Sequence, residues 1–461
     1  MRVFGRSLPM LVLLLATAAT ATAANPASGK GGWKAGLAKV VITPERPMWM
    51  AGYASRTSPS EGTLHDLWAK ALVLQDDQGS RSLLISLDLC GIDREFSIGV
   101  REEIAHRHGL PLDRIVLACS HTHTSPVVGS NLITMYPMDD EQRHRVASYT
   151  EILARTLVEL AGEAMRNLID VHLSHGQGKA GFAVNRREND QNRADELRAE
   201  LALKGPVDHD VPVLCLKTSD GTVKGVVFGY ACHCTTLALN HFSGDYAGFA
   251  MIELEKAYPD AVALFVAGCG ADQNPLPRRT VELAEKYGHE LADAVKRTVK
   301  GHLRPVLGCL RSGYEEVDLA FAPIPDRAHW EAEAASDQFA VANRAKSFLE
   351  RLDRGESLPE TYPYPVQVWR LGGLTWIFLG GEVVVDYSLR IKRNLGPDTF
   401  VSSYCNDVMA YIPSLRVLQE GGYEGATAMI YYGQPGPWAE DVEDRIIAGL
   451  NRVLRASAGQ E

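Results

Sequence analysis

The 461-residue sequence has no uninterrupted apolar stretch of about 18 residues, the length that a helix needs to cross a bilayer. It also lacks a cluster of Lys and Arg, and its formal net charge of −10 argues against a nucleic-acid partner. Its eight cysteines include no C-x-x-C pair, and most of them lie within apolar runs. We therefore expect mostly buried free thiols, with one disulfide bridge left open.

Three common catalytic signatures are missing as well. His289 and Glu290 are followed by Leu-Ala-Asp, so the H-E-x-x-H pair of helix-borne zinc proteases is absent. The G-x-S-x-G nucleophile elbow of many serine hydrolases is absent, and so is a Gly-rich phosphate-binding loop. These absences argue against a zincin protease, an α/β-hydrolase and a nucleotide-binding protein.

The N-terminus has the features of a secretory signal peptide. A basic segment, Met1–Arg6, precedes a short apolar run and then small residues up to Ala24. We therefore predict a signal peptide over 1–24, a flexible leader over 25–34 and a single catalytic domain over 35–456. The protein is expected to be secreted or periplasmic.

Short apolar runs alternate along the chain with segments of helical periodicity. This pattern predicts an α/β fold with a layered central β-sheet, or sheets, flanked by helices in a single elaborated domain. Residues 211–217 and 223–230 read as a hairpin around Ser219-Asp220-Gly221, and residues 322–362 as an exposed helical insertion. Further strands are expected at 36–43, 68–74, 82–88, 115–119, 261–267, 366–371, 375–379 and 400–404, and helices at 96–108, 142–167, 246–258, 279–300 and 442–454.

The stretch Ser120-His-Thr-His-Thr124 follows the apolar run that ends at Cys119. Because side chains alternate along a strand, His121 and His123 are expected to point the same way. Two imidazoles at a strand exit suit a zinc ion. A pair of hydrogen-bonded histidines in a polar loop explains the pattern equally well.

Other polar residues also follow apolar strands, where ligands collect in open α/β sheets. A catalytic zinc needs about three protein ligands and an open position, and His121, His233 and Glu382 would supply that set. The alternatives are that His233 is a core histidine and that Glu382 caps the following helix. Further polar residues at strand exits are Asp272, Asn406, Asp407 and Tyr411. The position of Asp272 favours a role in forming a loop, and Asp245 is expected to cap a helix.

The order of several short motifs resembles the neutral/alkaline (non-lysosomal) ceramidase family over nearly all of residues 35–440. Taken singly, these motifs are weak signals, whereas their collinear order is a strong one. They are Gly36–Pro44, Met50–Ala54, Leu64–Ala71, Ser120–Pro126, Ala183–Arg187, Phe228–Thr236, Phe242–Gly248, Ala410–Ser414 and Tyr423–Gly425.

This resemblance implies a zinc ion (Zn2+) bound by His121, His233, Glu382 and Tyr411. It further implies that His123 and Arg186 line the site. The implied chemistry is attack of a zinc-activated water on a carbonyl, with proton transfer through His123. Arg186 or Tyr411 would stabilise the negative charge that develops on the carbonyl oxygen.

Two departures from the family pattern bear on the substrate. Asn274 occupies the position of the family's active-site serine, which exchanges a hydroxyl for an amide. The sequence also stops at Glu461, so the family's C-terminal immunoglobulin-like domain is expected to be absent.

The resulting functional prediction is an exported zinc-dependent hydrolase that cleaves a linear amide (N-acyl) bond in a small molecule or lipid. A zinc-dependent esterase or deacetylase acting on lipid or glycan acyl groups stays open, as does a non-catalytic metal-binding relative. Residues 47–50 and 431–432 would suit either a transient membrane-surface contact or core packing. The oligomeric state is left open.

Overall fold

The first strand, β1 (Trp33–Val41), begins two residues before the expected start of the domain. A computed structural model describes residues 1–3, 5 and 32–458; apart from 1–3 and 5, the predicted signal peptide lies outside the described residues. Trp33 is buried and pairs with Val171 in the neighbouring strand. Residues 33 and 34, which the prediction assigns to the leader, belong to β1.

A mixed nine-stranded sheet forms the centre of the fold, in the order β11-β9-β8-β6-β1-β3-β4-β5, with β13 beside β6. The predicted hairpin is confirmed as the antiparallel pair β8–β9, whereas β4–β5 and β9–β11 are parallel pairs. The strands of the nine-stranded sheet that follow β1 are β3 (Trp68–Gln75), β4 (Arg81–Leu87), β5 (Ile115–Cys119), β6 (Ile169–Lys179), β8 (Asp210–Lys217), β9 (Val223–Tyr230), β11 (Val262–Ala267) and β13 (Arg304–Pro305).

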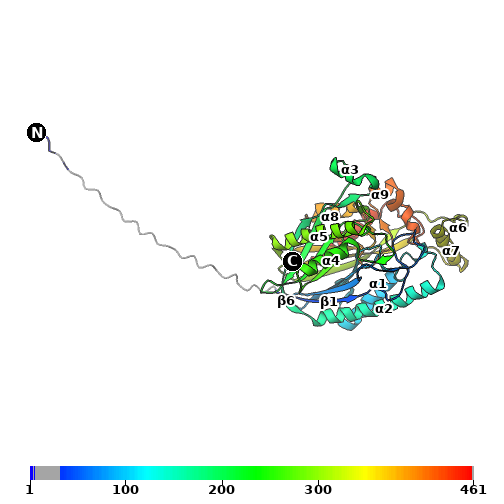
Figure 1. The fold of residues 1–461 in the computed structure, drawn as a ribbon, viewed down its shortest axis with the longest axis horizontal. Helices are drawn as coiled ribbons and strands as arrows, with labels where there is room; N and C mark the ends of the chain where they lie inside the picture. Colours follow the sequence, from blue (N-terminus) through cyan, green and yellow to red (C-terminus); the bar gives the residue numbers. More distant parts are fainter. Residues whose placement is uncertain (4, 6–31, 459–461) are drawn as a thin grey trace. The chain divides into compact units, whose positions relative to one another are not determined.

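Four helices cover one face of this sheet: α1 (Arg94–His108), α2 (Asp140–Arg166), α4 (Asp245–Ala257) and α5 (Val281–Lys300) (Figure 1). Three of them begin at a side-chain cap, because Asp93, Asp139 and Thr280 each accept a backbone N–H of the first turn. The largest apolar cluster lies between these helices and the sheet.

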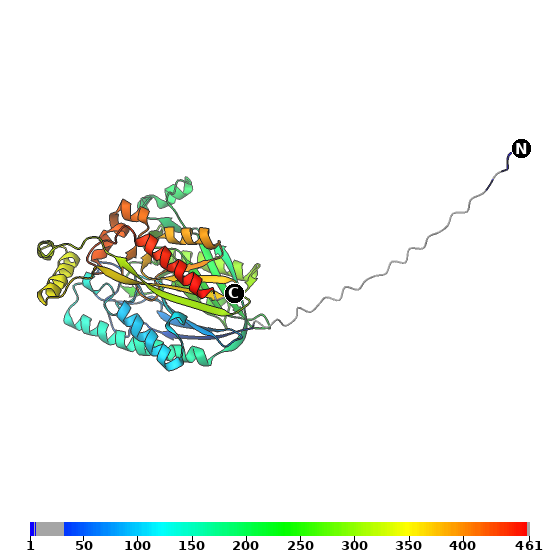
Figure 2. The same ribbon diagram turned by 180° about the vertical axis from the view of Figure 1, so that it is seen from behind.

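A second sheet stacks on the other face, in the order β14 (Leu310–Ala320), β15 (Thr361–Leu371), β16 (Leu374–Leu379) and β18 (Phe400–Ser402). Trp369 and Trp376 from this sheet pack in one cluster with Leu84 and Val116 of the first. Its outer face is covered by α11 (Val442–Ser457) and α8 (Val385–Leu395), which share a third cluster (Figure 2). The layers run helices, sheet, sheet, helices, which confirms the predicted α/β class.

The predicted insertion forms two helices, α6 (Arg327–Ala334) and α7 (Phe339–Asp353), around a small core of their own that includes Trp330 and Phe348. Short elements complete the chain: β2 (Gly62–Thr63), β7 (Ala183–Asn185), β10 (His241–Phe242), β12 (Gln273–Pro275), β17 (Glu382–Val383), β19 (Tyr411–Ile412), α3 (Ala194–Ala199), α9 (Leu415–Glu420), α10 (Gly422–Gly425) and 3-10 turns at Leu112–Arg114, Ile133–Met135, Gln191–Arg193 and Thr427–Ile430.

Two features left open by the sequence can be described here. Met48, Trp49 and Met50 are buried in the main core, and Tyr431 and Tyr432 are partly buried against it. All eight cysteines are free, and seven of them are buried. No helix in the described part of the chain has the length and apolarity of a membrane span.

The segment that follows β18, residues 403–406, is hydrogen-bonded to two strands of the first sheet. Ser403 N donates to Ala267 O at 2.9 Å, at the end of β11, and Asn406 N donates to Leu117 O at 2.7 Å, in β5. The C-terminal ends of β5, β11 and β18 therefore meet at one place, and the polar residues that follow these strands gather there.

Candidate metal centre

His121 and His123 meet through their Nε2 atoms, which lie 3.0 Å apart. The predicted convergence is correct, but its reason is wrong: β5 ends at Cys119, and both histidines lie in the loop that follows. His121 has a φ of 60°, the left-handed region that non-glycine residues rarely adopt. This turn, rather than strand alternation, aims His121 at its neighbour, and such strain is typical of functional sites.

The imidazoles of His121 and His233 are held in matching orientations. His121 Nδ1 lies 2.6 Å from Cys90 O, and His233 Nδ1 lies 2.8 Å from Gly270 O. A carbonyl oxygen can only accept, so each Nδ1 carries a proton, and in the neutral imidazole each Nε2 presents a lone pair. Backbone partners of this kind orient metal-binding histidines in proteins.

Glu382 faces both of these nitrogens, with Oε2 3.0 Å from His121 Nε2 and 3.0 Å from His233 Nε2. It does not cap α8, because Val385 N at the start of that helix donates to Asp272 Oδ1 at 2.9 Å. Asp272 thus holds the helix start and leaves the Glu382 carboxylate free to face the histidines.

Tyr411 closes the group from β19, which pairs in parallel with β17 and sets Tyr411 opposite Glu382. Its Oη lies 3.3 Å from His233 Nε2 and accepts a hydrogen bond from Arg186 Nη2 at 3.1 Å. Arg186 is fixed in turn by Glu424, whose Oε1 accepts from Nε at 2.7 Å. The four predicted ligand residues are therefore brought together, with Arg186 beside them.

The arrangement of these atoms fits a small cation. Two ligands that each lie about 2.0–2.1 Å from a tetrahedral zinc are separated by about 3.3 Å, and the observed separations are 3.0 to 3.3 Å. Glu382 Oε2 is buried, and its polar neighbours are the Nε2 atoms of His121 and His233. A positive charge, either a proton on His121 or a metal ion, stabilises this carboxylate oxygen beside the two ring nitrogens. His121, His233 and Glu382 could hold a metal ion, with Tyr411 as a fourth donor.

A second group of potential ligands, Cys90, His121 and His123, suits a metal less well. The Cys90 thiol lies 3.7 Å from His121 Nδ1, the nitrogen already bound to Cys90 O. The Nε2 side of His121 therefore belongs to the set that contains Glu382.

Charges in the site shift the pKa values of its members in opposite directions. Burial lowers the pKa of His121, but the Glu382 carboxylate outweighs it and raises that pKa to about 10. Burial and Arg186 lower the pKa of His233 to about 4, and burial with His121 lowers the pKa of His123 well below its usual value. Despite its burial, the pKa of Glu382 lies well below the usual range because of His121. The group thus favours one added positive charge beside a carboxylate.

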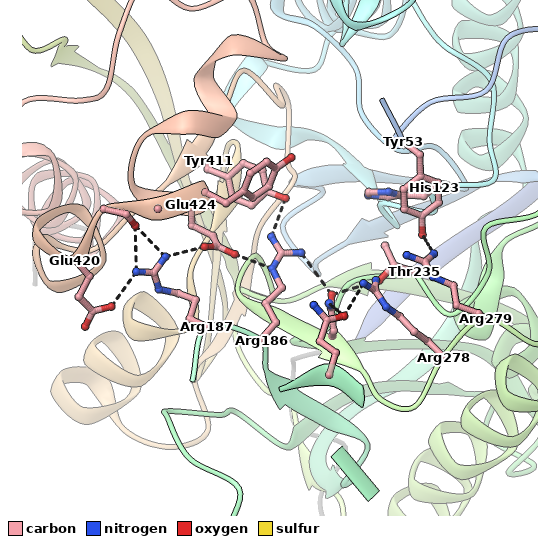
Figure 3. A pocket seen from close by; sticks show the side chains of 16 residues that line it. Tyr53, His123, Arg186, Arg187, Thr235, Arg278, Arg279, Tyr411, Glu420 and Glu424 are labelled. Carbon is pink, nitrogen blue, oxygen red and sulfur yellow. Dashed lines mark hydrogen bonds and ion pairs between the residues drawn. The ribbon is translucent and has the colours of Figure 1, made fainter. Parts of the chain in front are cut away.

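The site opens into a cavity of about 600 Å³ (Figure 3). His123, Arg186 and Tyr411 line it together with residues of the 420–424 segment and the 278–279 pair. In the close-up, Arg186 lies between Glu424 and Tyr411, and Tyr53 lies beside His123. A ligand in the cavity would therefore contact His123, Arg186 and Tyr411.

Asn274 lies in the cavity wall, where its Oδ1 is 3.4 Å from both Arg186 Nη1 and Thr235 Oγ1. Asn406 and Asp407 lie elsewhere: Asn406 binds Leu117 N and Gln367, and Asp407 accepts from Tyr362. Asp245 is the first residue of α4, and its carboxylate accepts from Leu237 N and Tyr246 N. These three polar residues are structural.

Several residues of the site were not predicted. Tyr432 donates to Glu382 Oε1, and Tyr404 stacks on His121 with ring centroids 4.4 Å apart. Gly52 and Tyr53 contact His123, and Glu424 holds Arg186. Gly52, Tyr53 and Glu424 fall within the quoted motifs, so these motifs were the available signal.

An α/β protein whose strand ends bring two histidines, a carboxylate and a phenol together beside a pocket has the donor set of a mononuclear metal site. The sequence profile of "Neutral/alkaline non-lysosomal ceramidase, N-terminal" matches residues 33–274, more than half of the chain. The chain belongs to this family, which confirms the resemblance. His121, His123, Arg186, His233 and Asn274 lie inside the match.

Individual relatives are distant in sequence. Neutral ceramidase A of Dictyostelium discoideum is 25% identical over 215 residues, 45% of this chain and 29% of that protein. Neutral ceramidase B of the same organism is 24% identical over 215 residues, again 45% of this chain and 29% of that protein. The neutral ceramidase of Pseudomonas aeruginosa is 21% identical over a 507-residue alignment that covers 92% of this chain and 72% of that protein. The matched segment thus spans under a third of the Dictyostelium relatives.

Solved structures share the fold. The crystal structure of neutral ceramidase from Pseudomonas aeruginosa superposes with a TM-score of 0.70 at 18% identity, over 92% of this chain and 75% of that one. A ceramidase complexed with C2 gives a TM-score of 0.69 at 18% identity, over 92% and 76%. This likeness supports the described architecture.

Proposed function

We propose that the chain is an exported zinc-dependent hydrolase that cleaves a linear amide (N-acyl) bond. The observation that carries this proposal is the convergence of His121 Nε2, His233 Nε2, Glu382 Oε2 and Tyr411 Oη beside a cavity. Family membership and the names of the relatives support the same type of reaction.

Two histidines, a carboxylate and a phenol are borderline-hard donors that suit zinc, and the backbone carbonyls behind the histidines keep their lone pairs available. A bound zinc would lower the pKa of a water molecule to about 7 and so supply a hydroxide nucleophile. The remaining tasks in amide hydrolysis fall to side chains of this chain.

His123 is placed to move the proton. Its Nε2 lies 3.0 Å from His121 Nε2, at the edge of the donor group, and its lowered pKa keeps the imidazole neutral at pH 7. It can then pass that proton to the leaving nitrogen, a step typically worth about 10²- to 10⁴-fold in rate.

We assign the binding of the carbonyl oxygen to Arg186 or Tyr411. Arg186 carries a guanidinium that Glu424 holds in position, and it already donates to Tyr411 Oη. A donor that is fixed before the reaction stabilises developing charge without reorganising. Asn274 adds an amide in the same wall, where the family pattern has a serine hydroxyl.

The metal part of the proposal is tested on the purified chain by elemental analysis. We expect about one zinc per chain in the wild type and none in His233→Ala, because that variant loses one donor. His289→Ala, an exposed histidine on α5, is the matched control and should keep its zinc. Absence of zinc from a wild-type sample incubated with zinc would contradict the proposal.

The bond specificity is tested with a panel of N-acyl sphingosines, N-acyl amines and acyl esters of the same chain length. We expect zinc-dependent cleavage of at least one amide, and loss of that activity in His233→Ala but not in His289→Ala. Cleavage confined to esters would replace the amidase by an esterase. A zinc-loaded protein that cleaves neither class would be a binding relative.

A further inference from the structure

The cavity beside the metal centre carries more positive than negative charge. Its lining includes four arginines and two glutamates. Glu424 accepts from Arg186 at 2.7 Å and from Arg187 at 2.7 Å, and Glu420 pairs with Arg187 at 2.9 Å. Among the described residues, Arg278 and Arg279 have no carboxylate partner within ion-pair distance. Two positive charges in the cavity are therefore not balanced by the protein.

Neutral groups hold these two guanidinium groups in place. Arg278 donates to Gln191 Oε1 at 2.6 Å and to Thr235 Oγ1 at 3.3 Å. Arg279 donates to Tyr53 Oη at 2.9 Å and lies over the Tyr53 ring, 5.0 Å from its centroid. Neutral acceptors fix the position of a charge without cancelling it, so both guanidiniums remain available to a ligand.

The backbone that carries this pair is strained. Arg279 has a φ of 94°, outside the regions that non-glycine residues prefer, and its N–H is bound to Thr236 O at 2.6 Å. Such a conformation costs about 1–3 kcal/mol. Burial and the adjacent Arg279 also lower the pKa of Arg278 to about 10, which leaves the group positive at neutral pH. Two like charges side by side on strained backbone are typical of a binding site rather than of a stabilising contact.

The pair lies close to the reacting groups. The Tyr53 ring that Arg279 covers is itself 4.7 Å from the His123 ring, edge to face. Figure 3 shows Arg278 and Arg279 below His123 and Tyr53, and Arg186 with Tyr411 to their left. A ligand group bound by the pair would therefore lie within the same cavity as the metal centre.

The rest of the lining is polar or aromatic. No Leu, Ile, Val, Met or Phe is among the described residues that line the cavity, and the tyrosines that line it, Tyr53, Tyr411 and Tyr423, each carry a hydroxyl. Small-molecule pockets are usually lined mostly by hydrophobic and aromatic side chains. A lining without these aliphatic side chains and phenylalanine suits a polar ligand.

We infer, building on the proposed function, that the substrate is an N-acyl compound whose amine part carries an anionic oxygen group, a carboxylate or a phosphate, bound by Arg278 and Arg279. Arginine suits this task because its planar fork matches both groups with two parallel hydrogen bonds. A neutral ceramide has no group for the pair. In the reaction, water supplies the hydroxyl of the new acid, the C–N bond breaks, and the leaving nitrogen gains a proton.

The inference is tested with four substrates of one acyl length: N-octanoylglycine, N-octanoylglycinamide, O-phospho-N-octanoylethanolamine and N-octanoylsphingosine. The glycine and glycinamide compounds have nearly the same shape but differ in charge, because a neutral carboxamide replaces the carboxylate. We expect kcat/KM to be roughly 10- to 100-fold higher for an anionic compound than for its neutral counterpart, the range of a charged hydrogen bond. A comparison of N-octanoylglycine with O-phospho-N-octanoylethanolamine shows whether the arginine pair binds a carboxylate or a phosphate.

The variants Arg278→Gln and Arg279→Gln are expected to remove most of this preference. The ratio between glycine and glycinamide compounds is taken within each variant, so partial loss of folded protein cancels. Arg297→Gln, exposed near the other end of α5, changes the net charge equally and should retain the full ratio. Equal kcat/KM for charged and neutral substrates, or a ratio unchanged in both pocket variants, would overturn the inference while leaving the amidase proposal intact.

Binding separates the two proposals if nothing in the panel is hydrolysed. The wild-type protein is then titrated calorimetrically with N-octanoylglycine and with N-octanoylglycinamide. Preferential binding of the glycine compound that is lost in Arg278→Gln would support the anion site even though the amidase proposal has failed. Equal binding, or binding of neither compound, would refute the anion site as well.

Discussion

Gly52 lies directly against the imidazole ring of His123. A Cβ built on Gly52 would overlap Cγ and Nδ1 of that ring and lie 2.7 Å from its Cβ. Gly52 also has a φ of 99°, a conformation open to glycine but rarely to other residues. Ala51 N donates to Ser125 O at 2.8 Å, which ties the two segments together. The backbone at 51–52 therefore sets the position of the His123 ring.

We predict that Gly52→Ala lowers kcat by roughly 100-fold, because a shift of about 1 Å in a catalytic group can cost that much. The zinc content should be unchanged, since the three atoms nearest to the added Cβ all belong to His123, which is not among the proposed ligands. Steady-state kinetics with zinc analysis measures both. Gly79→Ala is the matched control: its φ is 82°, but a Cβ there meets nothing within 4 Å. Equal activity of the two variants would show that contact with His123 is unimportant.

Glu424 is a positioning residue for Arg186. It is buried and binds both Arg186 and Arg187, whereas Glu420 is half-exposed and binds Arg187 and Arg416. We predict that Glu424→Gln lowers kcat about 10- to 100-fold, with a smaller effect on KM, because Arg186 is no longer held by a charged hydrogen bond. Glu420→Gln should stay within about 3-fold of the wild type. Equal losses in the two variants would mean that the ion-pair network acts as a whole and that Glu424 has no special role.

Much of the fold could be predicted because its strands are apolar and its helices are capped. Strands such as Ile115–Cys119 are buried along their whole length and read as hydrophobic runs. Strands β6 and β14 were missed because they carry many polar or charged side chains. β6 nevertheless lies in the middle of the first sheet, since β1 and β8 pair with both of its edges. Pairing partners far apart in the chain, rather than local composition, determine such strands.

Part of the candidate site could be predicted because the apolar strands that lead to it are visible in the sequence. A histidine or glutamate after an apolar strand is visible in the sequence, and the family motifs then select among such residues. The partners that orient them are not visible: Glu424 reaches Arg186 across 238 positions, and Asp272 rather than Glu382 binds Val385 N at the start of α8. The unbalanced charge of Arg278 and Arg279 was likewise hidden, because a sequence shows charges but not which of them are paired.

Asp407 makes the stability of the protein depend on pH. Its carboxyl is buried; Oδ2 accepts from Tyr362 at 2.7 Å, and Oδ1 has no hydrogen-bond partner in the described residues. Burial raises its pKa from 3.8 to about 7. Between about pH 4 and pH 7 the folded state therefore holds a proton that the unfolded state has released, so the free energy of unfolding falls as the pH rises through this window.

We predict that Asp407→Asn removes this part of the pH dependence, because an amide keeps an oxygen for Tyr362 and cannot ionise. The variant should match the wild type near pH 4 and be more stable at pH 8, by up to about 4 kcal/mol for a pKa difference of about 3 units. Urea or thermal unfolding at pH 4.5, 6 and 8 measures the difference.

Asp77→Asn, in the exposed turn after β3, controls for the loss of one charge. A stability difference between Asp407→Asn and wild type that is the same at pH 4.5 and pH 8 would show that Asp407 does not titrate in this window. Asp88 and Asp272, whose pKa values are raised to about 6 by burial, leave a residual slope of the same sign in every variant.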